Sequence, residues 1–208
     1  MKELLITSVI QDKNNNHRYH LYANEEYMGS VHEDIVIKYR LIKGKSISDQ
    51  DLKTMMVDDE RHQVYLAALK YLGYRPRTEK EVMMYLIRKG YDEKNCRAVM
   101  ARLIGEGYIN DEKYAEQWIK ERMMKKKGSL LLKKELLNKG IQSEIVEQAV
   151  SCINKDKEYE QALSLAEKKI TYFSNQLTSM QKKKKLGDFL LRRGFSYEMV
   201  QSVIDRLL

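Results

Sequence analysis

The chain has 208 residues with only one proline and ten glycines, and 33% of its residues are charged. This composition excludes fibrous and disordered proteins and favours a mainly helical protein with a real core. The charge is uneven, because residues 1–60 hold 8 Lys and Arg against 11 Asp and Glu, whereas residues 61–208 hold 30 against 19. An anionic partner is therefore expected on the second part, with nucleic acid as the leading candidate. A simpler alternative is that these charges only keep the helices soluble.

The first 31 residues have the sequence pattern of a small β-sheet. Three short runs rich in β-branched and aromatic residues are Leu4–Ile10, Arg18–Tyr22 and Tyr27–Val31. Polar turn sequences separate them, which predicts a three-stranded antiparallel meander. A sheet this small is marginal alone and should pack on a following helix.

Two helices are expected after the meander. Ser30 can cap a first helix that runs through Arg40 and ends near Gly44, and a second short helix is expected after Ser48. The residues up to 57 therefore form a β-rich extension with one or two short helices.

The rest of the chain is an internal repeat. One motif returns as Leu86–Tyr91, Leu136–Ile141 and Leu190–Phe195, each with a glycine next to its last residue. Apolar residues also recur six, nine and thirteen positions after each glycine, and the smallest of them is Ala149. These spacings predict a helix, a glycine turn and a second helix with an apolar stripe. A period of about 50 residues indicates a helical array.

Local signals divide this array into three-helix repeats. Asp58 and Asp59 suit a helix start, Thr78 and Glu81 form a capping box for the next helix, and Asp92 can cap the third. The expected domains are the extension at 1–57 and repeats 1, 2 and 3 at 58–108, 109–154 and 155–208.

Repeat 2 is expected to open with the longest helix of the chain. Asp111 is the predicted cap of this helix, which covers 112–127 and stops at Gly128. Its stripe includes Tyr114 and Trp118, and we expect Trp118 to belong to the core rather than to stack on bases. Repeat 3 opens near Asp156.

No catalytic, cofactor or metal site can be assembled from the sequence. The four histidines all lie in the first 62 residues, and His17 and His20 should point to opposite faces of a strand. The Asp58–Glu60 run is expected to be a solvated helix start. Cys96 and Cys152 offer no disulfide framework, are expected to be buried thiols, and fit a reducing cytoplasm. No apolar run approaches the length of a membrane span.

What remains is a basic surface that recurs at equivalent places in the three repeats. The candidate contact residues are Arg75, Arg77, Arg88 and Lys89 in repeat 1, Arg122, Lys125, Lys126, Lys127, Lys133 and Lys134 in repeat 2, and Lys182, Lys183, Lys184, Lys185, Arg192 and Arg193 in repeat 3. Such a track can follow a phosphate backbone or the acidic surface of a long protein partner. A base-reading helix-turn-helix is a further alternative, although glycine turns are common in structural helix pairs.

With these motifs in hand, the chain resembles the RecX family of regulators of the RecA recombinase. The residues that carry the resemblance are Arg75–Thr78, Glu81–Val82, Leu86, Lys89–Tyr91, Gly107–Asp111, Tyr114–Ala115, Trp118–Ile119, Arg122, Lys127–Gly128, Leu132–Lys133, Glu135–Leu136 and Lys139–Ile141. The match is close over residues 60–153 and looser in repeat 3. One departure is Ser129, where the family often has proline.

The resemblance implies a fold and a partner. The fold is mainly α, with three tandem three-helix repeats in an elongated, curved array after a small β-rich extension. The protein would be a monomeric, cytoplasmic, non-enzymatic regulator without cofactor or membrane partner. It would bind the RecA filament on single-stranded DNA, with double-stranded DNA as a further ligand, and inhibit recombinase, ATPase and co-protease activity in DNA repair, recombination and the SOS response. The alternative is a basic helical-repeat protein that binds DNA directly and competes for it.

Overall fold

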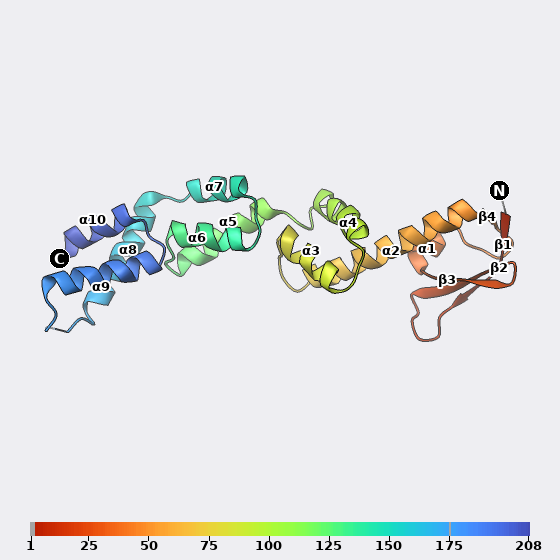
Figure 1. Ribbon diagram of the computed structural model, residues 1–208, viewed down its shortest axis with the longest axis horizontal. Coiled ribbons are helices and arrows are strands. Elements are labelled where there is room, and N and C mark those ends of the chain that lie inside the picture. Colours follow the sequence, from red (N-terminus) through yellow and green to blue (C-terminus); the bar gives the residue numbers. More distant parts are fainter. Residues whose placement is uncertain (1–2, 175) are drawn as a thin grey trace. The chain divides into compact units, whose positions relative to one another are not determined.

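The computed structural model describes residues 3–174 and 176–208, and within them ten helices and four strands (Figure 1). The chain divides into two compact units. An N-terminal unit contains residues 1–75 and 82–108, and a C-terminal unit contains residues 76–81 and 109–208. The predicted fold class is confirmed: the protein is mainly helical and begins with a small antiparallel sheet.

The N-terminal sheet has one strand more than predicted. Its strands are β1 (Glu3–Gln11), β2 (Arg18–Ala23), β3 (Glu26–His32) and β4 (Ser46–Ser48), in the order β3-β2-β1-β4. All pairings are antiparallel, with Tyr19 opposite Val31 and Leu4 opposite Ile47. The three predicted strands are confirmed. β4 escaped prediction because only Ile47 of its three residues is apolar.

The helices after the sheet differ from the expectation. Helix α1 (Glu33–Lys38) is capped by His32, not by Ser30, which lies within β3. Ser48 does cap a helix, through a reciprocal capping box with Asp51, but that helix is α2 (Asp49–Leu72), with 24 residues. The short helix predicted after Ser48 and the helix predicted from Asp58 are therefore one continuous helix. It spans the expected domain boundary at 57/58.

Helix α2 continues through its acidic residues Asp58–Glu60, and the contacts of Asp59 explain this. The prediction of a solvated helix start is wrong, because Asp59 is only 3% exposed. Its carboxylate accepts hydrogen bonds from Arg18 Nη1 at 2.8 and 3.1 Å, from the His32 backbone N–H at 2.7 Å and from Gln63 Nε2 at 2.8 Å. A buried carboxylate needs such partners. Asp59 therefore fastens the middle of α2 to the sheet.

Three-helix repeats make up the rest of the protein. Repeat 1 consists of the second half of α2, α3 (Glu79–Arg88) and α4 (Glu93–Gly105); repeat 2 of α5 (Asp111–Met124), α6 (Ser129–Asn138) and α7 (Ser143–Ser151); repeat 3 of α8 (Lys155–Ile170), α9 (Ser179–Arg192) and α10 (Tyr197–Leu207). The leucines four places before each glycine, Leu86, Leu136 and Leu190, are fully buried, as the periodicity predicts. Cys96 is buried as expected, but Cys152 is exposed at the end of α7.

The helix caps are partly as predicted. The Thr78–Glu81 capping box and the Asp92 cap are confirmed. Asn110, not Asp111, caps α5, because the Asp111 carboxylate accepts instead from the Glu79 backbone N–H at 2.9 Å. Helix α5 has 14 residues, so it is shorter than α2.

The basic residues after α5 are not its last turn. The helix ends at Met124, and Lys126 has a positive φ of 52°. Gly128 begins α6 rather than ending α5. The chain therefore reverses within the basic stretch itself.

Repeats 2 and 3 join through backbone hydrogen bonds at a glycine turn. Gly128 N–H donates to the Arg193 carbonyl at 2.9 Å, and Leu130 N–H donates to the Gly194 carbonyl at 3.0 Å. Ser129 N–H donates to the buried Glu158 carboxylate at 2.6 Å. Helix α6 has no side-chain cap of its own, so atoms of repeat 3 satisfy its first donors. A proline at position 129 could not donate to Glu158.

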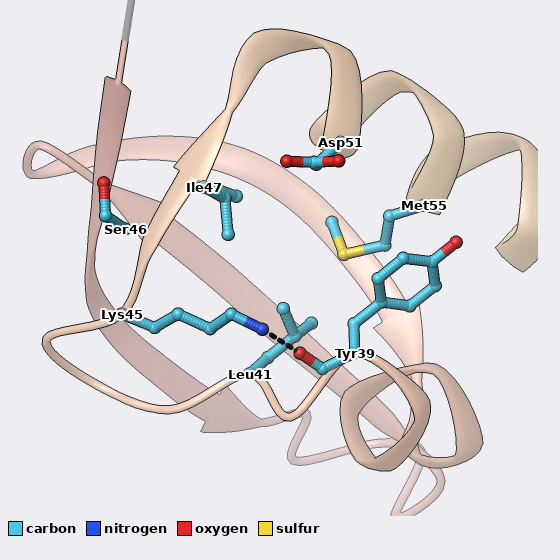
Figure 2. Close-up of a pocket in the computed structure, with 7 residues that line it drawn as sticks. All are labelled: Tyr39, Leu41, Lys45, Ser46, Ile47, Asp51 and Met55. Atoms are coloured by element: carbon cyan, nitrogen blue, oxygen red, sulfur yellow. Dashed lines mark hydrogen bonds between the residues drawn. The ribbon is translucent and has the colours of Figure 1, made fainter.

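A pocket of about 260 Å³ lies in the N-terminal unit, between the loop after α1 and the start of α2, and Figure 2 shows the residues that line it. Leu41, Ile47 and Met55 supply apolar side chains. The Lys45 amine donates to the Tyr39 backbone carbonyl, and the Tyr39 hydroxyl donates to Asp58 at 2.7 Å. Burial and the neighbouring Asp58 raise the pKa of Tyr39 to about 12. These polar groups serve the packing of the unit.

Candidate nucleic-acid and protein interface

The four candidate residues of repeat 1 lie at the two ends of α3. Arg75 is exposed and Arg77 half-buried, just before the helix. Arg88 and Lys89 are exposed at its C-terminal end, where Arg88 Nε donates to the Met84 carbonyl at 3.2 Å. The Lys89 ammonium lies 5.9 Å from the centre of the Tyr85 ring. Both charges at this end reach solvent.

In repeat 2 the carboxylate of Glu135 binds two candidate residues. It lies 2.5 Å from Lys127 Nζ and 3.7 Å from Arg122 Nε, and it accepts from the Trp118 indole N–H at 3.0 Å. Burial alone would raise the pKa of Glu135, but the hydrogen bonds from Lys127 and Trp118 lower it overall. Arg122 also lies over the Trp118 ring, 4.1 Å from its centre. Arg122 and Lys127 thus have structural roles.

Lys139 is a third structural cation in the same region. It binds Glu81 at 2.9 Å and lies 4.5 Å from the centre of the Trp118 ring and 5.4 Å from that of Tyr114. Burial would lower the pKa of Lys139, but Tyr114 and Glu81 raise it overall. Trp118 packs against the core of repeat 2. Its core role is as predicted, and its ring is shared with two cations of the protein itself.

Other candidates also have intramolecular partners. Lys133 binds Glu147, and Lys126 donates to Ser164 Oγ at 2.7 Å. Arg193 donates to the Lys125 backbone carbonyl at 3.4 Å and lies 5.5 Å from the centre of the Phe189 ring. Within the described residues, the candidate side chains for which no hydrogen bond or ion pair is observed are Lys89, Lys125, Lys134, Lys182, Lys183, Lys184, Lys185 and Arg192.

Repeat 3 contains a groove that combines positive charge with aromatic rings. It has a volume of about 430 Å³ and lies between the end of α8, the following loop and α9. Lys169, Lys185 and Arg192 supply positive charge, Tyr172, Phe173 and Phe189 supply rings, and Asp188 is the acidic member of the lining. We call these residues the repeat-3 groove.

The chemistry of the repeat-3 groove suits a single-stranded nucleic acid. Lys185 and Arg192 are seven residues apart on α9, which is two helical turns, so they share a face. Tyr172 is 83% exposed and Lys169 Nζ lies 5.5 Å from the centre of the Phe189 ring. Cations can bind phosphates while exposed rings stack on bases. Lys185 and Arg192 are among the predicted contact residues, so two of those residues line the same groove.

Sequence reasoning missed Lys169 and the three rings. Tyr172 and Phe173 follow α8, which ends at Ile170. A usable signal was present in Thr178 and Gln181, which form a capping box at the start of α9. That box places a loop before it, and aromatic residues in a loop are candidates for contact.

These features define a class of protein: a tandem array of three-helix repeats with a β-rich N-terminal domain and basic residues left on its surface. Among the described residues, no helix combines the length and apolar character that crossing a membrane requires.

The sequence matches four family descriptions in the order of its domains. They are the regulatory protein RecX N-terminal domain at residues 4–48 and the first, second and third three-helix domains of RecX at 65–103, 110–150 and 156–204. A regulatory protein RecX of Bacillus cytotoxicus is 32% identical over 98% of this chain and 77% of its own length. The chain therefore belongs to the RecX family of regulatory proteins.

Two solved structures are similar to this one. A crystal structure of regulatory protein RecX has a TM-score of 0.81 with 25% identity, covering 97% of this chain and 99% of the other. The crystal structure of RecX from Lactobacillus salivarius has a TM-score of 0.65 with 32% identity, covering 72% of this chain and 97% of the other. This chain thus shares its fold with two solved members of its family.

Proposed function

We propose that this protein is a non-enzymatic regulator that binds the RecA filament on single-stranded DNA and inhibits its recombinase, ATPase and co-protease activities. The observation that carries the proposal is the match to all four RecX domains in order along the chain. Its basic surface fits a partner that exposes phosphates and acidic side chains.

The contacts of the individual cations refine which residues bind the filament. Arg122, Lys127, Lys133 and Lys139 already bind carboxylates of the protein, so moving them to a partner would cost those ion pairs. Among the described residues, the cations of the repeat-3 groove and of the Arg88–Lys89 turn form no ion pair, so binding a partner would not break one. We therefore expect these two places to supply most of the contact energy.

A second candidate function is direct competition for DNA. The repeat-3 groove favours it, because cations beside exposed rings suit a single strand without any second protein. The two functions differ in stoichiometry. A protein that binds across filament subunits acts below one copy per RecA, whereas a competitor must cover the DNA.

The first experiment measures DNA-dependent ATP hydrolysis by RecA while this protein is added before or after filament assembly. Inhibition of preformed filaments well below one copy per RecA is the expected result. Inhibition that begins only when the DNA is saturated would replace the proposal by competition. No inhibition at any ratio would overturn both.

A matched pair of variants tests the repeat-3 groove. Lys185→Glu with Arg192→Glu reverses two groove charges, and Lys113→Glu with Lys120→Glu reverses two exposed charges on α5 with the same change in net charge. Losing two phosphate contacts should lower the slope of log affinity against log salt for single-stranded DNA by about 1.4.

The control variant should keep most of the slope. Circular dichroism must show equal helicity in the two variants. Equal loss in both would mean that only net charge matters, and the groove would then no longer be a contact site.

A further inference from the structure

The N-terminal unit brings together histidines that lie far apart in the sequence. His32 is the last residue of β3, Asp34 lies in the first turn of α1, and His62 lies in the middle of α2. The His32 and His62 ring centres are 4.5 Å apart. One nitrogen of each histidine and one carboxylate oxygen of Asp34 all lie within 4.8 Å of one another.

The distances among these atoms fit one metal ion. Asp34 Oδ2 lies 3.1 Å from His62 Nε2 and 3.6 Å from His32 Nδ1. A tetrahedral Zn²⁺ with bonds of about 2.0–2.1 Å holds neighbouring ligand atoms about 3.3 Å apart. The two distances lie on either side of that value, so small side-chain rotations suffice.

The hydrogen bonding of His32 also suits a metal. His32 Nδ1 accepts a hydrogen bond from the Asp34 backbone N–H at 3.2 Å, so it presents a lone pair rather than a proton. A metal ion requires neutral imidazole.

Hydrogen bonds within the unit leave one ligand atom unused. His62 Nε2 is buried, and within the described residues its contact with Asp34 lacks hydrogen-bond geometry. The two atoms are close but not aligned with each other, as two ligands of a shared cation would be. Asp34 is 58% exposed, which leaves room for water at a fourth position.

We propose that His32, Asp34 and His62 form a binding site for a divalent transition metal ion of the Zn²⁺ type, with water as the fourth ligand. Two imidazoles and one carboxylate are ligands that Zn²⁺ commonly takes. Metal bound at His32 Nδ1 replaces the hydrogen bond that this atom accepts at the start of α1. In exchange, the ion links β3 and α1 to the middle of α2, beside the Arg18–Asp59 ion pair.

The site predicts a structural effect. A ligand that binds only the folded state stabilises that state. Zn²⁺ should therefore raise the melting temperature of the intact chain by a few degrees and protect α2 from proteolysis.

The test uses the untagged full-length protein, stripped with a chelator and titrated with Zn²⁺ by calorimetry near neutral pH. The test variants are His62→Gln and Asp34→Asn, and the control is His20→Gln. His20 is the matched control because it lies in the same unit but binds Asp12 and Tyr27 on the sheet, outside the cluster. Tetrahedral Co²⁺ absorption gives a second readout.

We expect one Zn²⁺ per chain with micromolar or tighter affinity, weakened by at least about tenfold in both test variants and unchanged in His20→Gln. Asp34→Asn keeps the proposal testable if His62→Gln fails to fold, because Asp34 is exposed. Saturable binding that is equal in all variants, or the lack of saturable binding in the micromolar range, would overturn the site.

Discussion

The glycine turns of repeat 1 and repeat 3 have similar local sequences and different surroundings. Gly90 and Gly194 have φ angles of 86° and 91°, and each is preceded by a cation and followed by an aromatic residue. A Cβ added at Gly194 would lie 2.2 Å from Leu131 Cβ and 2.5 Å from the Leu131 backbone nitrogen. At Gly90 no atom of the described residues lies within 4 Å of such a Cβ. The Gly194 turn is packed within the joint between repeats 2 and 3, whereas the Gly90 turn lies at the surface.

The cations before these glycines differ in the same way. Lys139, which precedes the glycine of repeat 2, binds Glu81 and lies against Trp118. Lys89, at the same place in repeat 1, is exposed. A recurring basic residue therefore does not imply a recurring function. In this family member the turn of repeat 1 keeps its charge available, while the turn of repeat 2 uses it to hold two helices together.

The largest expected effect is that of Gly194→Ala. The substitution combines a positive φ with a clash against backbone atoms, which cannot rotate away. We expect it to lower the free energy of unfolding by about 4 kcal/mol in urea denaturation.

Gly187→Ala is the control for Gly194→Ala. Gly187 lies within α9, and a Cβ there would meet Ile204 Cδ1 at an ordinary 3.4 Å. This substitution should be neutral or stabilising by about 0.5–1 kcal/mol. If Gly194→Ala were no worse than Gly187→Ala, the backbone joint between repeats 2 and 3 would not exist in solution.

Lys139→Met should have a smaller effect with a distinct pH dependence. It removes the Lys139–Glu81 ion pair and the contact of the ammonium with the Trp118 ring, and we expect a loss of about 2 kcal/mol near pH 7. The pKa of Lys139 is raised above 10.5 in the folded state, so its contribution is complete below pH 10.5 and is lost as pH rises further. The difference between wild type and variant should therefore shrink above pH 10.5. A difference that stays constant to higher pH would mean that the lysine acts only through packing.

Gly90→Ala isolates the cost of the backbone conformation. With open space around the site, only the positive φ penalises alanine, and we expect a loss of about 1 kcal/mol. Thermal denaturation of Gly90→Ala and Gly194→Ala under the same conditions measures the contribution of the joint as the difference. Equal losses would remove the contrast between the two turns.

Lys89→Met should have the smallest effect on stability, within about 0.5 kcal/mol, because an exposed lysine makes little net contribution. Its expected effect is on binding, since the proposed function uses the Arg88–Lys89 turn. Fluorescence anisotropy with RecA filaments, before and after the substitution, checks this point. Unchanged filament affinity would limit the contact to the other repeats.

The repeats were predictable because their signals are local and periodic. Leu86, Leu136 and Leu190 are buried as their spacing requires, and the Thr78 and Asp92 caps were read directly from neighbouring residues. Family resemblance was predictable for the same reason, since the motifs around the turns are contiguous. The errors concern positions whose partner is distant in sequence. Asp59 looks like a helix start until Arg18, 41 residues away, is placed beside it.

Only part of the candidate site could be predicted from the sequence. Sequence alone identified the basic residues, but it could not separate Lys127, which Glu135 binds, from Lys185, which lines the repeat-3 groove. The two lysines occur in similar basic stretches. What distinguishes them is the carboxylate or ring that the packing of helices brings near each one.

Sequence by itself determined the helical class, the three repeats, the glycine turns and the family of this protein, because these depend on propensity and on periods of a few residues. Tertiary structure alone decided which turn is a joint, which cations are already paired, and that His32, Asp34 and His62 meet. Those outcomes depend on contacts between residues that are distant along the chain. A local sequence pattern does not indicate which distant residues come into contact.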